Sequence, residues 1–94
     1  MNNQKIIIES LAMDLKRLAL GLHRGSYMVA NRFKEEALKR GEELKNQKPN
    51  DYLLNLLDKS RKAIEKHSDR TAEDALMYST LFQNYCLKHF SGRL

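Results

Sequence analysis

The apolar residues near the start of the chain repeat with the period of an α-helix. They step by three, four, three and four positions in the series Ile8, Leu11, Leu15, Leu18 and Leu22. Side chains at these spacings lie along one face of a helix. Elsewhere no apolar–polar alternation persists and no Asn-Gly or Asp-Gly pair marks a hairpin. We therefore expect an all-α fold, a small antiparallel bundle of three to four helices.

The length and the cysteine content limit the possible classes of protein. A chain of 94 residues fits a single helical domain over positions 1–94. Cys86 is the only cysteine, which excludes an internal disulfide and suits a reducing compartment. Glu9 and Asp14 interrupt the apolar N-terminal segment, so neither a signal peptide nor a membrane span is predicted. We expect a soluble, cytoplasmic protein.

The end of the first helix has two interpretations. Gly25 and Ser26 resemble a break. The apolar stripe nevertheless continues in phase through Val29 and Phe33, and a loop would usually reset that phase. We therefore favour one long helix, kinked near Gly25, that runs to about Lys45. The alternative is two helices joined by a turn at residues 24–26, with Ser26 as the N-cap of the second.

Two further helices are predicted, over residues 52–67 and about 72–90. The single proline of the chain stops the preceding helix, and Asn50 or Asp51 can cap the next one. Thr71 is the expected N-cap of the last helix. Short connections make neighbouring helices antiparallel, which predicts a bundle.

A continuous first helix would need a partner. At about 40 residues it would span about 60 Å and outreach the two shorter helices, leaving apolar surface to be covered by dimerisation. The leading prediction is therefore a non-catalytic helical interaction module, acting as a homodimer or as a small accessory subunit. The expected interface residues come from the apolar stripe: Leu18, Leu22, Gly25, Val29 and Phe33.

The charge of the chain supports a second interpretation. Seventeen lysines and arginines against twelve acidic residues leave a net charge of +5, which favours anionic partners. A basic helix face could contact phosphates and bind nucleic acid. The candidate residues for this face are Arg61, Lys62, Lys66 and Arg70.

Two arginine–histidine pairs resemble a family motif. Arg17 precedes His23 by six positions, and Arg61 precedes His67 by the same interval. This spacing is similar to the Arg-x4–6-His motif of HEPN-type RNases, small helical dimers in which both protomers line an RNA-cutting cleft. The resemblance implies an RNase-like bundle as the form of the nucleic-acid interpretation. The residue after arginine is usually polar and uncharged in that family, whereas here it is leucine or lysine.

A cysteine and a histidine could form half of a metal site. Cys86 and His89 lie three positions apart and would share a helix face. His67 is expected near the start of the last helix, whereas His89 lies at its far end. The remaining metal ligands could therefore come only from His23 or from a second subunit. The favoured interpretation is structural, and the sequence assigns no metal, no cofactor and no catalytic residue.

Overall fold

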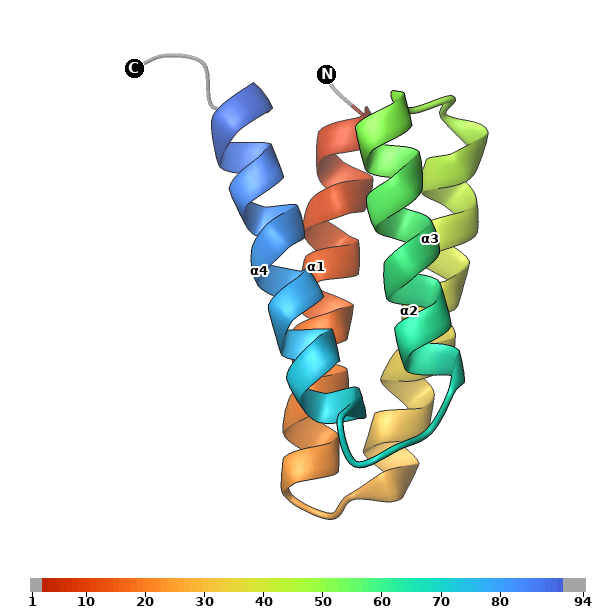
Figure 1. The fold of residues 1–94 in the computed structure, drawn as a ribbon, viewed down its shortest axis with the longest axis vertical. Helices are drawn as coiled ribbons and strands as arrows, with labels where there is room; N and C mark the ends of the chain where they lie inside the picture. Colours follow the sequence, from red (N-terminus) through yellow and green to blue (C-terminus); the bar gives the residue numbers. More distant parts are fainter. Residues whose placement is uncertain (1–2, 91–94) are drawn as a thin grey trace.

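Residues 3–90, the part of the chain described by the computed structural model, form four antiparallel α-helices and no strand (Figure 1). The helices are α1 (Asn3–His23), α2 (Tyr27–Asn46), α3 (Asp51–Glu65) and α4 (Thr71–Phe90). The all-α bundle predicted from helical periodicity is therefore confirmed. No helix within these residues is both long and apolar enough to cross a membrane.

A glycine turn separates α1 from α2. Gly25 has φ of +71° and its N–H donates to the carbonyl of Leu22 at 3.1 Å, while the N–H of Ser26 donates to the carbonyl of Gly21 at 2.9 Å. This pair of hydrogen bonds is the Schellman motif, which ends a helix with a left-handed residue. The continuous helix to Lys45 that the apolar phase favoured is wrong, and the two-helix alternative is confirmed.

The first turns of α3 and α4 are stabilised by hydrogen bonds to the side chains of Asn50 and Thr71. Asn50 caps α3, since its side-chain oxygen accepts from the N–H of Leu53 at 2.9 Å, and its amide also donates to the hydroxyl of Tyr85. Thr71 is the first residue of α4 rather than its N-cap. Its hydroxyl accepts from the N–H of Ser68 at 2.9 Å and donates to a loop carbonyl, so it fastens the α3–α4 connection.

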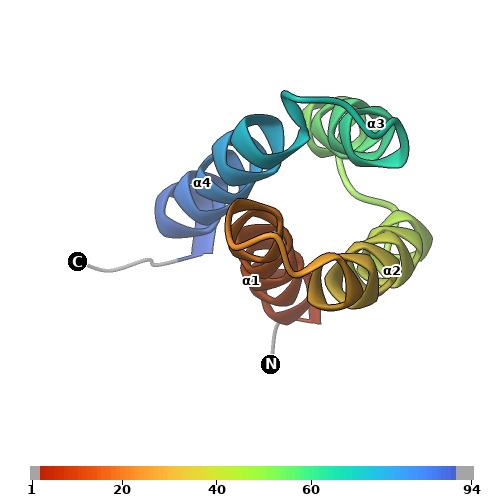
Figure 2. The ribbon, with the colours of Figure 1, turned by 90° about the horizontal axis from the view of Figure 1, so that it is seen from below.

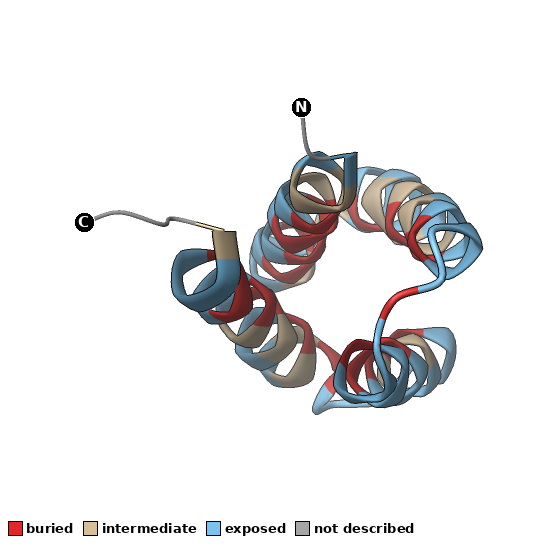
Figure 3. Ribbon diagram, turned by 90° about the horizontal axis from the view of Figure 1, so that it is seen from above, coloured by how far each residue is buried: buried red, intermediate tan, exposed pale blue. Residues whose placement is uncertain are grey.

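The four helices form a ring in which α1 lies between α2 and α4 (Figure 2). Helix α1 packs against α2 on one side and α4 on the other, while α3 lies diagonally across from it and contacts α2 and α4 (Figure 2). The buried positions of all four helices face the axis of the bundle (Figure 3). The largest fully buried apolar side chains are Phe82, Ile8, Leu11, Leu15, Leu44 and Leu53.

Candidate binding cavity and interaction ridge

The turn changes the position of the predicted interface residues. Leu18 is 2% exposed and lies in the core of its own chain, and Leu22 and Phe33 pack partly buried against that core. Gly25 forms the exposed turn, and Val29 is 43% exposed at the start of α2. Because α1 and α2 fold back on each other, they cover the surface that a continuous helix would have left open.

The glycine beside the turn permits the close approach of these two helices. A Cβ atom added at Gly21 would lie 3.0 Å from the backbone nitrogen of Ala30. No side chain fits there without moving the backbone of α2. Gly21 therefore serves the crossing of α1 and α2, which is the structural role that small residues at helix contacts typically have.

An exposed apolar ridge runs along the outer face of α1. Ile6, Met13 and Leu20 are 48%, 39% and 41% exposed, and they are separated by seven residues each. Side chains seven positions apart lie almost in line along a helix. On the adjacent face of α4, Leu87 lines a shallow depression together with Met13, and Leu76 is also exposed. We call Ile6, Met13 and Leu20 the α1 ridge.

Charged side chains flank the α1 ridge. Glu9 lies between Ile6 and Met13, and Arg17 lies between Met13 and Leu20. Both are exposed, and the Arg17 guanidinium carbon is 5.6 Å from the centre of the Phe33 ring. Glu9 and Arg17 therefore lie on the two sides of the ridge, each four residues from Met13, and the exposed Lys16 precedes Arg17 in the sequence.

One ion pair is partly buried beside the ridge. The Oδ2 atom of Asp14 lies 3.9 Å from the Nε atom of Arg40, which connects α1 to α2, and both atoms are buried without a hydrogen-bond partner. Burial raises the pKa of the Asp14 carboxyl above its ordinary value of 3.8. The charge of Arg40 opposes this pKa shift, and the charge of Glu36 adds to it.

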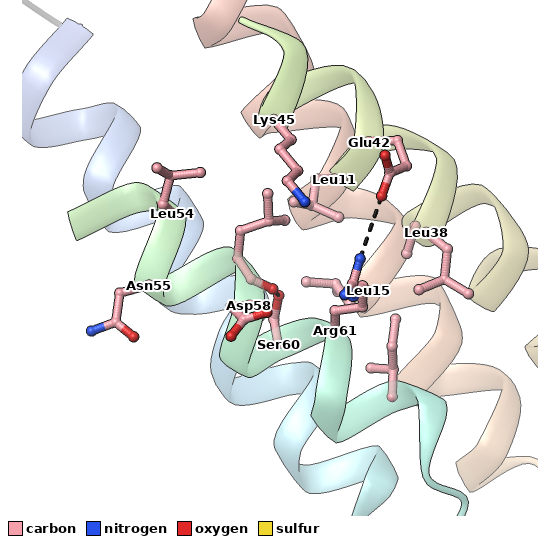
Figure 4. A pocket seen from close by; sticks show the side chains of 14 residues that line it. Leu11, Leu15, Leu38, Glu42, Lys45, Leu54, Asn55, Asp58, Ser60 and Arg61 are labelled. Atoms are coloured by element: carbon pink, nitrogen blue, oxygen red, sulfur yellow. Dashed lines mark hydrogen bonds and ion pairs between the residues drawn. The ribbon is translucent and has the colours of Figure 1, made fainter. Parts of the chain in front are cut away.

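An apolar cavity opens between α2 and α3. Its volume is about 310 Å³, and its floor is formed by the inner face of α1 (Figure 4). The apolar side chains around it include Leu11, Leu15, Ala37, Leu38, Leu57 and Ile64. The cavity exists because α3 is diagonal to α1 and does not close over it.

Two ion pairs and a lysine surround the mouth of this cavity. Arg61 on α3 reaches Glu42 on α2 at 3.4 Å, so this pair bridges the opening (Figure 4). Asp58 is neutralised by Lys62 at 3.4 Å. Lys45 extends from α2 over the opening (Figure 4).

The basic residues predicted from the sequence lie in the last turns of α3 and in the loop that follows it. Arg61 and Lys62 each contact a carboxylate, as described above. Lys66 is the C-cap of α3, and Arg70 lies in the loop before α4. Both are exposed, and acidic side chains stand beside them in the sequence.

The arginine and the histidine of each predicted pair have different surroundings. Within residues 3–90 no hydrogen bond or ion pair joins Arg17 to His23, or Arg61 to His67. Arg17 lies over a phenylalanine ring while His23 is exposed in the last turn of α1. Arg61 bridges the cavity mouth, and His67 is an exposed residue of the α3–α4 connection.

The candidate metal pair is engaged in packing. The Cys86 thiol is buried, 4.0 Å from the carbonyl oxygen of Lys5, and His89 stacks on Tyr85 with 4.2 Å between ring centres. Burial raises the pKa of the Cys86 thiol to about 11. The charge of Glu9 adds to this pKa shift and the charge of Lys5 opposes it. Residues 3–90 contain no cluster of three or more metal-ligating side chains.

No protein-family model, curated protein or solved structure matches the chain. The α1 ridge was absent from the sequence prediction, although its seven-residue spacing is present in the sequence. The cavity has no sequence signal, because it depends on how far α3 stands from α1.

Proposed function

We propose that this chain is a non-catalytic helical interaction module that pairs with a second copy of itself through the α1 ridge. The observation that carries the proposal is the exposed line of Ile6, Met13 and Leu20. Contiguous exposed apolar surface is typical of protein–protein contacts. A cytoplasmic location belongs to the proposal, because a lone free thiol suits a reducing compartment.

Two copies of α1 that run antiparallel can pair through the same ridge residues. If a two-fold axis passes at Met13, that residue meets its own copy, and Ile6 meets Leu20 of the second copy. The same operation brings Glu9 to the height of Arg17 of the second copy along the helix axis, and it does so twice. Both apolar and charged positions therefore match in a single register.

The apolar and charged residues contribute differently to this dimer. Burial of Met13 and its two ridge neighbours supplies the attraction, at about 25 cal/mol for each Å² of apolar surface removed from water. The Glu9–Arg17 pairs lie at the rim, where exposed ion pairs contribute little energy but select the orientation. Leu76 and Leu87 on α4 extend the apolar contact beside the ridge.

The oligomeric state tests the proposal. Light scattering coupled to size-exclusion chromatography should give twice the mass of one chain at high protein concentration, with dissociation on dilution. Met13→Glu should give a monomer, because it places two like charges together at the two-fold axis. The matched control is Met28→Glu, at a methionine that is 85% exposed outside the ridge, which should remain a dimer.

A charge exchange tests the antiparallel register. Glu9→Arg or Arg17→Glu alone should weaken the dimer, because each places like charges opposite each other. The double variant should recover the affinity of the wild type at low salt. A wild-type chain that stays monomeric, or a Met13→Glu variant that still dimerises, would contradict the proposal.

The same chromatography distinguishes the nucleic-acid alternative. The chain has four tyrosines and no tryptophan, so it absorbs weakly at 280 nm and bound nucleic acid would be evident at 260 nm. A protein-like spectrum is expected for the interaction module. Excess 260 nm absorbance that disappears in high salt would instead favour nucleic-acid binding.

A further inference from the structure

The cavity between α2 and α3 is separate from the proposed dimer surface. Helix α1 contributes opposite faces to the two features: Leu11 and Leu15 form the cavity floor, whereas Met13 lies on the outer ridge. A dimer formed through the ridge would therefore leave the cavity mouth open. The cavity can therefore be filled whether or not the dimer forms.

The interior of the cavity suits an apolar chain. Leucine, isoleucine and alanine side chains from three helices form its walls. The buried polar residue Ser60 has already committed its hydroxyl, which donates to the carbonyl of Leu57 at 2.8 Å. The part of a ligand that enters can therefore gain by burying apolar surface, while a polar group placed there would lose its hydration.

The volume of the cavity sets the size of that chain. An apolar protein cavity of about 150 Å³ holds benzene, with its six carbon atoms. A volume of about 310 Å³ is twice as large. It therefore accommodates on the order of a dozen non-hydrogen atoms by the same measure.

The mouth of the cavity carries a positive charge. Glu42 is paired with Arg61, and Asp58 is paired with Lys62, so these two pairs are neutral. Lys45 makes no ion pair within residues 3–90, and its amino group lies over the opening (Figure 4). The Nε atom of Arg61 is also buried there without a hydrogen-bond partner. Together these two side chains offer donors to one anionic group.

We propose that the α2–α3 cavity binds an amphiphile that has one unbranched apolar chain and a carboxylate head, with about ten carbon atoms in all. The chain lies between α2 and α3 over Leu11 and Leu15. The carboxylate accepts hydrogen bonds from the amino group of Lys45 and from the guanidinium of Arg61. The exposed Arg61–Glu42 bridge costs little to rearrange on entry.

Decanoate, below its micelle-forming concentration, is the probe. Titration into the wild-type protein, followed by amide chemical shifts and by calorimetry, should give saturable binding with one ligand per chain. The shifts should concentrate in the segments of α2 and α3 around Gly41 and Leu57. Decyltrimethylammonium has a similar chain and the opposite charge, and it should bind at least about tenfold more weakly, a difference of about 1.4 kcal/mol.

A variant that fills the cavity tests the site itself. Gly41 lines the cavity, and a Cβ atom there would meet the flexible Cδ1 atom of Leu57 at 3.2 Å. Gly41→Met should therefore occupy the space and abolish decanoate binding. The helix should persist, because methionine has a higher helix propensity than glycine. An unchanged circular dichroism spectrum confirms the fold.

The role of the head group is tested with lysine variants. Lys45→Met should weaken decanoate binding by about tenfold, whereas Lys39→Met, on the same helix outside the cavity lining, should leave it unchanged. Absence of saturable binding, undiminished binding by Gly41→Met, or equal binding of both amphiphiles would overturn the proposal. Met13→Glu should bind decanoate as the wild type does. The test of the cavity is therefore independent of the test of the dimer.

Discussion

The hydroxyl of Ser79 donates a 2.6 Å hydrogen bond to the backbone carbonyl of Ala12, and both residues are buried between α4 and α1. Ser79→Ala should lower the free energy of unfolding by about 1 kcal/mol, the net contribution of a typical hydrogen bond. Urea denaturation measures this change. Thr80→Ala is the matched control, because its hydroxyl is exposed and bonds within its own helix. An equal loss in both variants would contradict this role for Ser79.

The turn between α1 and α2 should be sensitive to substitution at one glycine. Gly25→Ala should destabilise the protein by about 1–2 kcal/mol, because a side chain is unfavourable at its φ of +71°. Gly25→Asn should cost less, since asparagine tolerates this conformation better. Thermal unfolding measures both effects. Nothing lies within 4 Å of an added Cβ atom, so the loss comes from backbone conformation alone.

Cys86 should react slowly with alkylating agents. Its thiol is buried and its pKa is raised to about 11, so little thiolate forms at pH 8. The alkylation rate of the native protein should be far below that of the urea-unfolded chain and should rise with denaturant. Mass spectrometry over time provides the measurement. Rapid modification of the native protein would show that the thiol is more accessible than its burial indicates.

The stability of the protein should carry a pH dependence due to Asp14. The carboxyl has a higher pKa in the folded state than its ordinary 3.8, so the folded protein holds this proton more strongly than the unfolded chain. Proton binding to Asp14 therefore adds to the free energy of unfolding at low pH. This contribution is lost as the pH rises through the raised pKa of the folded state. Measured between about pH 3 and pH 7, the wild type should lose stability relative to Asp14→Asn. A constant difference would contradict the raised pKa.

The helical periodicity was sufficient to predict the all-α bundle. The inward faces of α1 and α4 follow directly from the positions of Leu11, Leu15, Ala75 and Phe82. The buried face of a helix is set by the spacing of its own apolar residues, and this spacing can be read directly from the sequence. Asn50 was one of two predicted N-caps of α3, with Asp51 the other, and the hydrogen bond from the Leu53 N–H shows that Asn50 is the cap.

The break at Gly25 was harder to predict, because the apolar pattern continues almost in phase across it. In the structure the buried position near the start of α2 is Ala30, one place beyond Val29, and Val29 itself is exposed. A shift of one residue is too small to distinguish a turn from a kink by periodicity. The hydrogen bonds of the Schellman motif decide it, and they are formed only in the folded turn.

The candidate sites depend on packing between helices and were therefore less accessible. The sequence shows the seven-residue spacing of the α1 ridge. Whether these residues face the core or the solvent, however, is decided by the packing of α1 between α2 and α4. The cavity depends on the diagonal position of α3. Neither position follows from the residues of a single helix.

The diagonal position of α3 also affects how the bundle opens. Helix α1 packs extensively against both α2 and α4, whereas α3 contacts the same two helices much less, with the cavity on its inner side and an exposed ion pair across the cavity mouth. Cooperative units with fewer buried contacts open at a lower free energy than the whole molecule. We therefore expect the backbone amides of α3 to exchange with solvent deuterium before those of α1. Exchange in α3 would then report a partial opening of the native bundle rather than its global unfolding.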